Sequence, residues 1–76
     1  MYKIVNNKQP FQSVSNGFAF NINENVTAKL YISVDGGTYY PYQEDIVAPD
    51  YVIVCNCVPD MFFYIDGITE PIKILL

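Results

Sequence analysis

The sequence predicts a single all-β domain, built as a small antiparallel β-sandwich or partly open barrel of about seven short strands. Apolar and polar residues alternate along several segments with the period of two that a half-buried strand requires. Turn signals rich in Gly, Pro, Asn and Asp separate these segments at intervals of roughly 8–12 residues. No segment has an apolar stripe of helical spacing, and 76 residues suffice for one domain, residues 1–76.

Three short strands are predicted in the N-terminal part of the chain. They span Tyr2–Val5, Phe11–Val14 and Phe18–Ile22. The Ser15-Asn16-Gly17 turn separates the second strand from the third. Alternate apolar residues of the third strand share one face and are predicted to enter the core: Phe18, Phe20 and Ile22.

The clearest alternation runs from Val26 to Asp35. Its apolar positions are Val26, Ala28, Leu30, Ile32 and Val34, and its polar face carries Tyr31. Asp35-Gly36-Gly37 then predicts a tight hairpin turn, because glycine tolerates the positive φ that such turns require. A returning strand begins at Thr38, and Pro41 either ends it or places it at a sheet edge, because proline cannot donate to a ladder.

The C-terminal half predicts further strands. They are a short edge strand at Glu44–Val47, the most apolar strand at Tyr51–Cys57, then Phe62–Ile65 and Ile68–Leu76, with Pro71 marking an edge or a strand start. The last residues, Ile72 to Leu76, are unusually apolar for a terminus, which normally frays. We therefore expect this segment to be paired, either within the domain or against a neighbouring subunit. Ile53, Cys55 and Ile65 complete the predicted core.

Charge and composition restrict the classes of partner. The net charge is −4, with four lysines and no arginine, which disfavours binding to nucleic acids or to anionic membranes. No apolar run approaches the ~20 residues of a membrane span, and the N-terminus lacks the apolar stretch of a signal peptide, so synthesis in the cytoplasm is expected. Only 16 % of residues are charged, against ~25 % in a typical soluble domain. Either polar loops replace these charges, or another chain covers part of the surface.

The sequence predicts no catalytic residue, cofactor or metal site. Histidine is absent, which removes the most frequent general base and metal ligand. Glu44 and Asp45 are adjacent and would face opposite sides of a strand, whereas the other acids fall mostly in turns. Cys55 and Cys57 would lie on one face roughly 6.5–7 Å apart, at or beyond the limit for a disulfide. We interpret them as free, buried thiols, as suits a reducing compartment.

Tyrosines are the strongest candidates for a binding surface. Tyr31 lies on the polar face of its strand, and Tyr39, Tyr40 and Tyr42 follow the Gly-Gly turn. Three interpretations remain open: a platform on which sugar rings stack, a protein interface, and cross-strand pairs that only stabilise the sheet. The apolar terminus adds Ile72, Ile74 and Leu76 to the predicted contact surface.

The stretch Ser33-Val34-Asp35-Gly36-Gly37-Thr38-Tyr39 resembles the strand–Gly–Gly–strand signature of small β-rich virion proteins of tailed bacteriophages. That class includes capsid decoration proteins and the capsid-anchored domains of head fibres. The similarity extends over roughly residues 26–76 and includes the closing segments Gly67-Ile68-Thr69 and Lys73-Ile74-Leu75. It implies a non-enzymatic structural protein on a virus particle, often multimeric, and it carries over no functional residue.

Two functional hypotheses follow, and a protein antagonist, such as an inhibitor of host defence, also remains open because a short acidic β protein of a phage would look much the same. The first is a structural or interaction protein of a phage virion, made in the host cytoplasm, which binds a capsid protein or a neighbouring subunit by surface complementarity and forms a homo-oligomer. The alternative is a small carbohydrate-binding module, in which tyrosines supply the stacking platform: Tyr31, Tyr39, Tyr40 and Tyr42.

Overall fold

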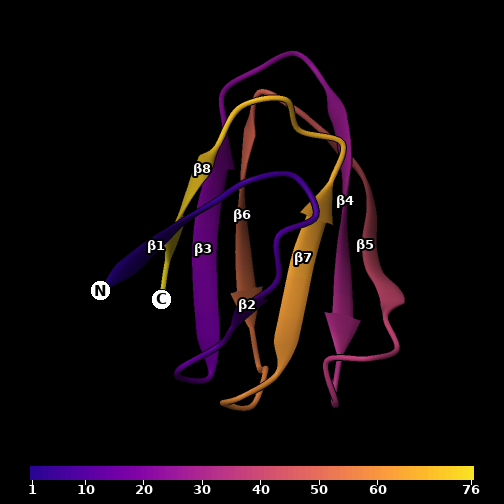
Figure 1. The fold of residues 1–76 in the computed structure, drawn as a ribbon. Coiled ribbons are helices and arrows are strands. Elements are labelled where there is room, and N and C mark those ends of the chain that lie inside the picture. Colours follow the sequence, from indigo (N-terminus) through magenta and orange to yellow (C-terminus); the bar gives the residue numbers. More distant parts are fainter.

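The computed structural model describes residues 1–76 and contains eight strands and no helix. The strands are β1 (Tyr2–Val5), β2 (Phe11–Gln12), β3 (Gly17–Ile22), β4 (Thr27–Ser33), β5 (Tyr40–Val47), β6 (Asp50–Cys55), β7 (Phe62–Asp66) and β8 (Ile72–Leu75). They form two four-stranded antiparallel sheets, sheet A with the order β1-β8-β3-β6 and sheet B with the order β2-β7-β4-β5 (Figure 1). The predicted all-β sandwich is confirmed.

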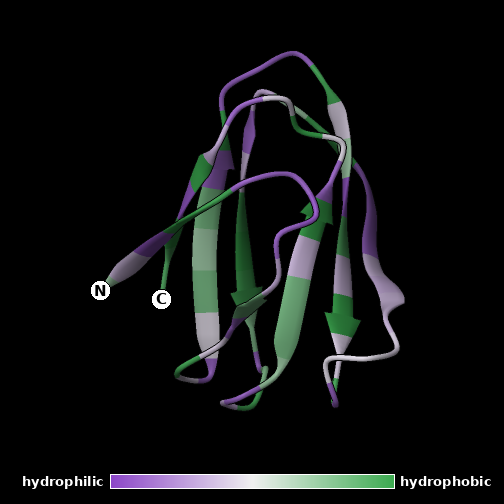
Figure 2. Ribbon diagram, in the orientation of Figure 1, coloured by the Kyte–Doolittle hydropathy of each residue, from purple (hydrophilic) through white to green (hydrophobic).

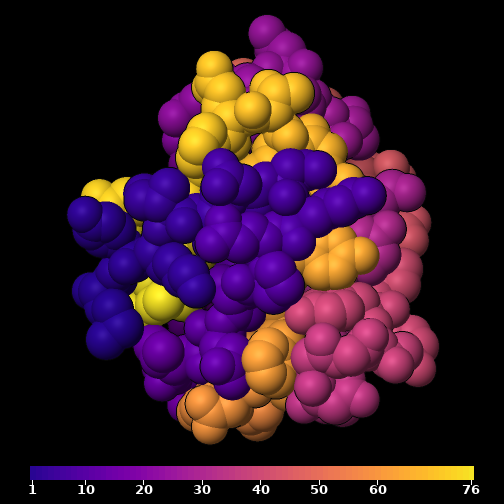
Figure 3. Space-filling model, in the orientation of Figure 1, coloured from indigo at the N-terminus to yellow at the C-terminus, as the bar shows by residue number.

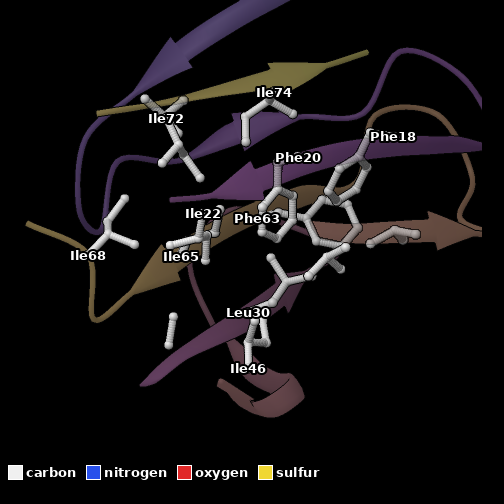
Figure 4. Packing of buried hydrophobic residues seen from close by; sticks show 14 of the residues in the cluster. Phe18, Phe20, Ile22, Leu30, Ile46, Phe63, Ile65, Ile68, Ile72 and Ile74 are labelled. Carbon is white, nitrogen blue, oxygen red and sulfur yellow. The ribbon is translucent and has the colours of Figure 1, made fainter. Parts of the chain in front are cut away.

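The core lies between the two sheets. Strands β3 and β8 of sheet A and β4, β5 and β7 of sheet B direct alternate apolar side chains into the same space (Figure 4). Three phenylalanines meet at its centre. The ring of Phe18 packs edge-on against Phe11 at 5.2 Å and against Phe63 at 4.6 Å between ring centroids. Such edge-to-face contacts add to the free energy gained from burial.

Hydropathy follows this arrangement along the ribbon. The strands that line the core are predominantly apolar, whereas the connections are polar, and β5 is the most polar of the long strands (Figure 2). The N-terminal segment passes from sheet A to sheet B and covers one side of the sandwich (Figure 3). Its two strands are the outermost members of their sheets, β1 of sheet A and β2 of sheet B.

The predicted phase of β6 is wrong. Val52 and Val54 are buried, whereas Ile53 is 63 % exposed and Cys55 is also exposed. Residues 51–55 are apolar at every position, so alternation gives no information on which residues face the core. The two cysteines therefore do not share an environment: Cys57 is buried beyond the end of the strand, and Cys55 lies on the surface.

The prediction that Val34 enters the core is also wrong. Strand β4 ends at Ser33, which is buried, and Val34 is 78 % exposed in the connection that follows. Ala28 and Leu30 are buried as predicted, and Val26 and Ile32 are partly buried against the core. The predicted hairpin is confirmed, since β4 pairs with β5. Its connection is longer than the predicted tight turn, as the last pair before it joins Ile32 to Tyr40.

Strand β5 unites two segments that the sequence predicted separately. It runs from Tyr40 to Val47 along the edge of sheet B and includes Pro41, which such an edge accommodates. Its pairing with β4 shifts twice, and Asp45 adopts a φ of 58°. Each shift leaves one extra residue on β5, the pattern of a β-bulge.

The C-terminal strand is paired within the domain. β8 lies between β1 and β3 and is hydrogen-bonded to both. Ile72 and Ile74 are buried in the core, and Leu76 is partly buried against it. The prediction that Ile72 and Ile74 form a contact surface must therefore be corrected, because both side chains are already enclosed by the folded chain (Figure 4).

Candidate interaction surfaces

Three of the tyrosines form a cluster on the outer face of sheet B. Tyr31 of β4 is in register with Tyr64 of β7, and their rings stack at 4.7 Å with an interplanar angle of 16°. The ring of Tyr39 leans over Tyr64 at the same distance, 4.7 Å, with an angle of 59°. Burial raises the pKa of Tyr39, and the nearby Tyr64 and Asp35 add to the increase. The cluster therefore includes Tyr64, which the sequence did not single out.

This arrangement favours the stabilising interpretation for two of the predicted binding residues. A sugar ring would need a free aromatic face, whereas Tyr31 stacks one face on Tyr64 and Tyr39 packs at a tilt against the same ring. Cross-strand aromatic pairs of this kind typically stabilise a sheet by ~0.2–1 kcal/mol. Tyr40 and Tyr42, in contrast, are exposed on the edge strand β5.

The connection between β4 and β5 holds Tyr39 in place. The Asp35 carboxylate accepts hydrogen bonds from the backbone N–H groups of Gly37 and Thr38 at 2.8 and 3.0 Å and from the Ser33 hydroxyl at 2.9 Å. The hydrogen bond from Thr38 is the largest of the contributions that lower the pKa of Asp35 to about 2. Gly36 adopts a φ of +79° beside the ring of Phe62. The Asp-Gly-Gly sequence thus builds a closed loop.

A second candidate surface, which the sequence did not predict, is the outer face of sheet A. Four residues on it are in register across all four strands and form what we call the apolar row: Tyr2, Leu75, Ala19 and Ile53. Tyr2 is 55 % exposed and Leu75 52 % exposed. Ile4 and Tyr51 extend the exposed apolar area beside the row. About half or more of each of the side chains of Tyr2, Leu75, Ile4 and Tyr51 is exposed.

The surface is hollowed along β3. A cavity of about 670 Å³ is lined by residues of all four strands, among them Ile4, Ala19, Ile53 and Leu75. A neighbouring hollow of about 540 Å³ shares the last three of these and continues past Gly17. The hollow forms because the residues of β3 on this face, such as Ala19, are smaller than the neighbouring Ile53 of β6 and Leu75 of β8. A Cβ on Gly17 would lie 2.6 Å from the Val54 carbonyl oxygen, so this end requires glycine.

One end of the hollow is polar, and of its two glutamates Glu24 has a carboxylate that is already engaged. Glu24 accepts hydrogen bonds from the backbone N–H and hydroxyl of Thr69 at 2.8 and 2.9 Å and from the N–H of Glu70 at 2.9 Å. The Thr69 N–H is the main cause that lowers the pKa of Glu24. This carboxylate therefore fixes the connection between β7 and β8. On the same face, the Lys73 ammonium lies 4.2 Å from the centroid of the Tyr2 ring.

The groups with chemical reactivity are dispersed. No three acids or cysteines lie close enough together to hold a metal ion. The two carboxylates with shifted pKa values, Glu24 and Asp35, are both kept in the charged form by the loops that they close. The chain forms no helix with the length and hydrophobicity of a membrane crossing.

Comparison of the chain with protein-family models, with curated proteins and with solved structures finds no match.

Proposed function

We propose that the chain is a non-enzymatic structural or interaction protein that binds a protein partner through the outer face of sheet A. The apolar row carries this proposal. Tyr2, Leu75 and Ile53 expose apolar side chains in register on a hollowed surface, and contiguous exposed apolar area of this kind is typical of protein interfaces. Tyr2, Tyr51 and Lys73 on the same face combine an apolar body with a polar end. They can therefore contact both apolar and polar groups of a partner.

We further propose that the partner is a capsid protein and that the chain is a component of a phage virion. The resemblance of residues 26–76 to small β-rich virion proteins supports this step. So does the low content of charged residues, 16 %, which suits a surface that another protein covers. Burial of the apolar row would then supply the main free energy of attachment, because apolar area removed from water contributes about 25 cal/mol per Å².

The test is attachment to particles. If the proposal is correct, the chain will sediment with purified particles of the phage that encodes it, and the variant Leu75→Asp will largely lose this association. Val47→Asp is the matched control, because it places the same charge at an exposed apolar position of β5, on the other sheet. Circular dichroism will establish that both variants fold.

Two results would contradict the proposal. In one, the chain remains in the supernatant after the purified particles have been sedimented. In the other, Val47→Asp weakens attachment as much as Leu75→Asp, which would place the contact elsewhere.

Carbohydrate binding is the second candidate function, because Tyr40 and Tyr42 are exposed on β5. It would use fewer tyrosines than the sequence indicated, because Tyr31 and Tyr39 both pack against Tyr64. A glycan array separates the two candidates: binding that Tyr40→Ala abolishes and Leu75→Asp preserves would favour the carbohydrate module.

A further inference from the structure

Strand β6 offers an open hydrogen-bonding edge. It is hydrogen-bonded only to β3, through six consecutive register pairs without a bulge. The N–H of Tyr51 donates to the Asp50 carboxylate at 2.8 Å and therefore points away from β3. Backbone groups alternate in direction along an antiparallel strand, so the N–H and C=O groups of Ile53 and Cys55 also point to the open side.

The other sheet edges are poorer templates. β5 carries Pro41, two register shifts and the adjacent acids Glu44 and Asp45, features that hinder the addition of another strand. β2 has only two residues and β1 has four. β6 has six residues and contains neither proline nor lysine. It is the one long, regular edge of the sandwich.

We propose that β6 pairs in antiparallel fashion with β6 of a second copy of the chain, about a two-fold axis through Ile53. This inference goes beyond the proposed function, because it concerns the edge of sheet A and needs no capsid partner. In this register each Ile53 exchanges both backbone hydrogen bonds with Ile53 of the partner subunit. Tyr51 does the same with Cys55 of the partner subunit, and its N–H leaves Asp50.

The strand is complementary to itself in this register. On the core side, Val52 lies opposite Val54 of the partner subunit, and both are apolar and buried against their own sheet. Asp50, the only charged residue of β6, lies opposite the end of the partner strand, beyond Cys55 of the partner subunit, so the pairing brings no like charges together. Pairing also continues the apolar row across the axis and places Ile53, its most exposed member, beside Ile53 of the partner subunit.

The experiment measures the molar mass of the purified full chain by light scattering after size exclusion, over a range of concentrations. We expect the wild type to form a dimer and Ile53→Pro to be a monomer. Proline removes the N–H that faces the partner strand and leaves the bonds from β6 to β3 intact. Ile53→Ala is the matched control, because it truncates the same side chain but keeps this N–H, and it should still dimerise.

A second measurement tests the register even if Ile53→Pro fails to fold. The double variant Ile53→Cys with Cys55→Ser places one thiol on the two-fold axis, where facing Cα atoms lie ~5.5 Å apart, within the range of a disulfide. We expect mild oxidation to give a covalent dimer. Ile4→Cys with Cys55→Ser, at a similarly exposed position on the opposite edge of sheet A, should form no covalent dimer. A monomeric wild type, or equal cross-linking of the two double variants, would overturn the proposal.

Discussion

At the scale of single residues, Ser13 shows how one hydroxyl joins distant segments. The residue is completely buried, and its Oγ donates to the Val58 carbonyl at 2.7 Å and accepts from the Met61 N–H at 3.1 Å. Ser13→Ala leaves both groups without that partner, which should lower the free energy of unfolding by ~1–3 kcal/mol in urea denaturation. Ser15→Ala, at an exposed hydroxyl, should change it by less than ~0.5 kcal/mol. Equal effects would mean that these hydrogen bonds contribute nothing specific.

Asp35 makes the stability of the hairpin loop depend on pH. Its pKa in the folded chain is about 2, below the ordinary value of 3.8, so the contribution of this carboxylate is present above about pH 4 and is lost as the pH falls toward 2. Asp35→Asn should lower the urea midpoint at pH 5, and the difference from the wild type should shrink between pH 4 and pH 2. The Glu44 carboxylate accepts no hydrogen bond. The urea midpoint of Glu44→Gln should therefore not converge with that of the wild type in this way. A constant difference across this range would contradict the assignment.

At the scale of elements, the point at which β4 ends can be tested directly. Leu30 is completely buried and lies in register with Ile65, whereas Val34 is exposed beyond the end of the strand. Leu30→Ala should cost ~2–5 kcal/mol, comparable with the whole stability of so small a domain, so this variant is expected not to fold as a monomer. Val34→Ala should change stability by less than ~0.5 kcal/mol. Circular dichroism and urea denaturation will distinguish them, and a large loss at Val34 would restore the prediction that the structure overturns.

The strands differ in how much of their environment can be predicted from the sequence. In β4, polar residues such as Lys29 mark the solvent face, and this fixes Ala28 and Leu30 in the core. In β6, apolar residues occupy both faces, so the sequence identifies a strand but not its phase. Alternation predicts that Val34 is buried and Ser33 is exposed, but the structure shows the opposite. The reason is that the loop closed by Asp35 ends the strand before the alternation in the sequence ends.

The candidate surfaces show the same limit at longer range. The tyrosines near the Gly-Gly turn were identifiable from their clustering, but their partner Tyr64 is known only once β7 is placed beside β4. The apolar row requires the register of four strands, which come from both ends and the middle of the chain. The apolar residues on both faces of β6 were the available signal. A strand whose two faces are both apolar is either buried on both sides within its own domain or exposes one face to which another protein can bind.

At the scale of the whole molecule, the chain closes its own core. Its radius of gyration is 11.2 Å, close to the ~11 Å expected of a compact 76-residue domain, and both sheets meet within one chain. Pairing through β6 would join the two copies at a sheet edge, beside outer residues such as Ile53, and would complete no part of the core. Dimerisation and folding should therefore be separable.

This separation predicts how stability depends on concentration. Dilution should dissociate the dimer while the near-ultraviolet circular dichroism, which reports the packed tyrosines, stays unchanged. The thermal midpoint of the wild type should rise modestly with protein concentration, because association stabilises the folded state by mass action, whereas that of Ile53→Pro should not change. If the near-ultraviolet signal instead disappears on dilution, dissociation would coincide with unfolding. The two copies would then share a folding unit, and the closed core of the single chain would not be sufficient for its stability.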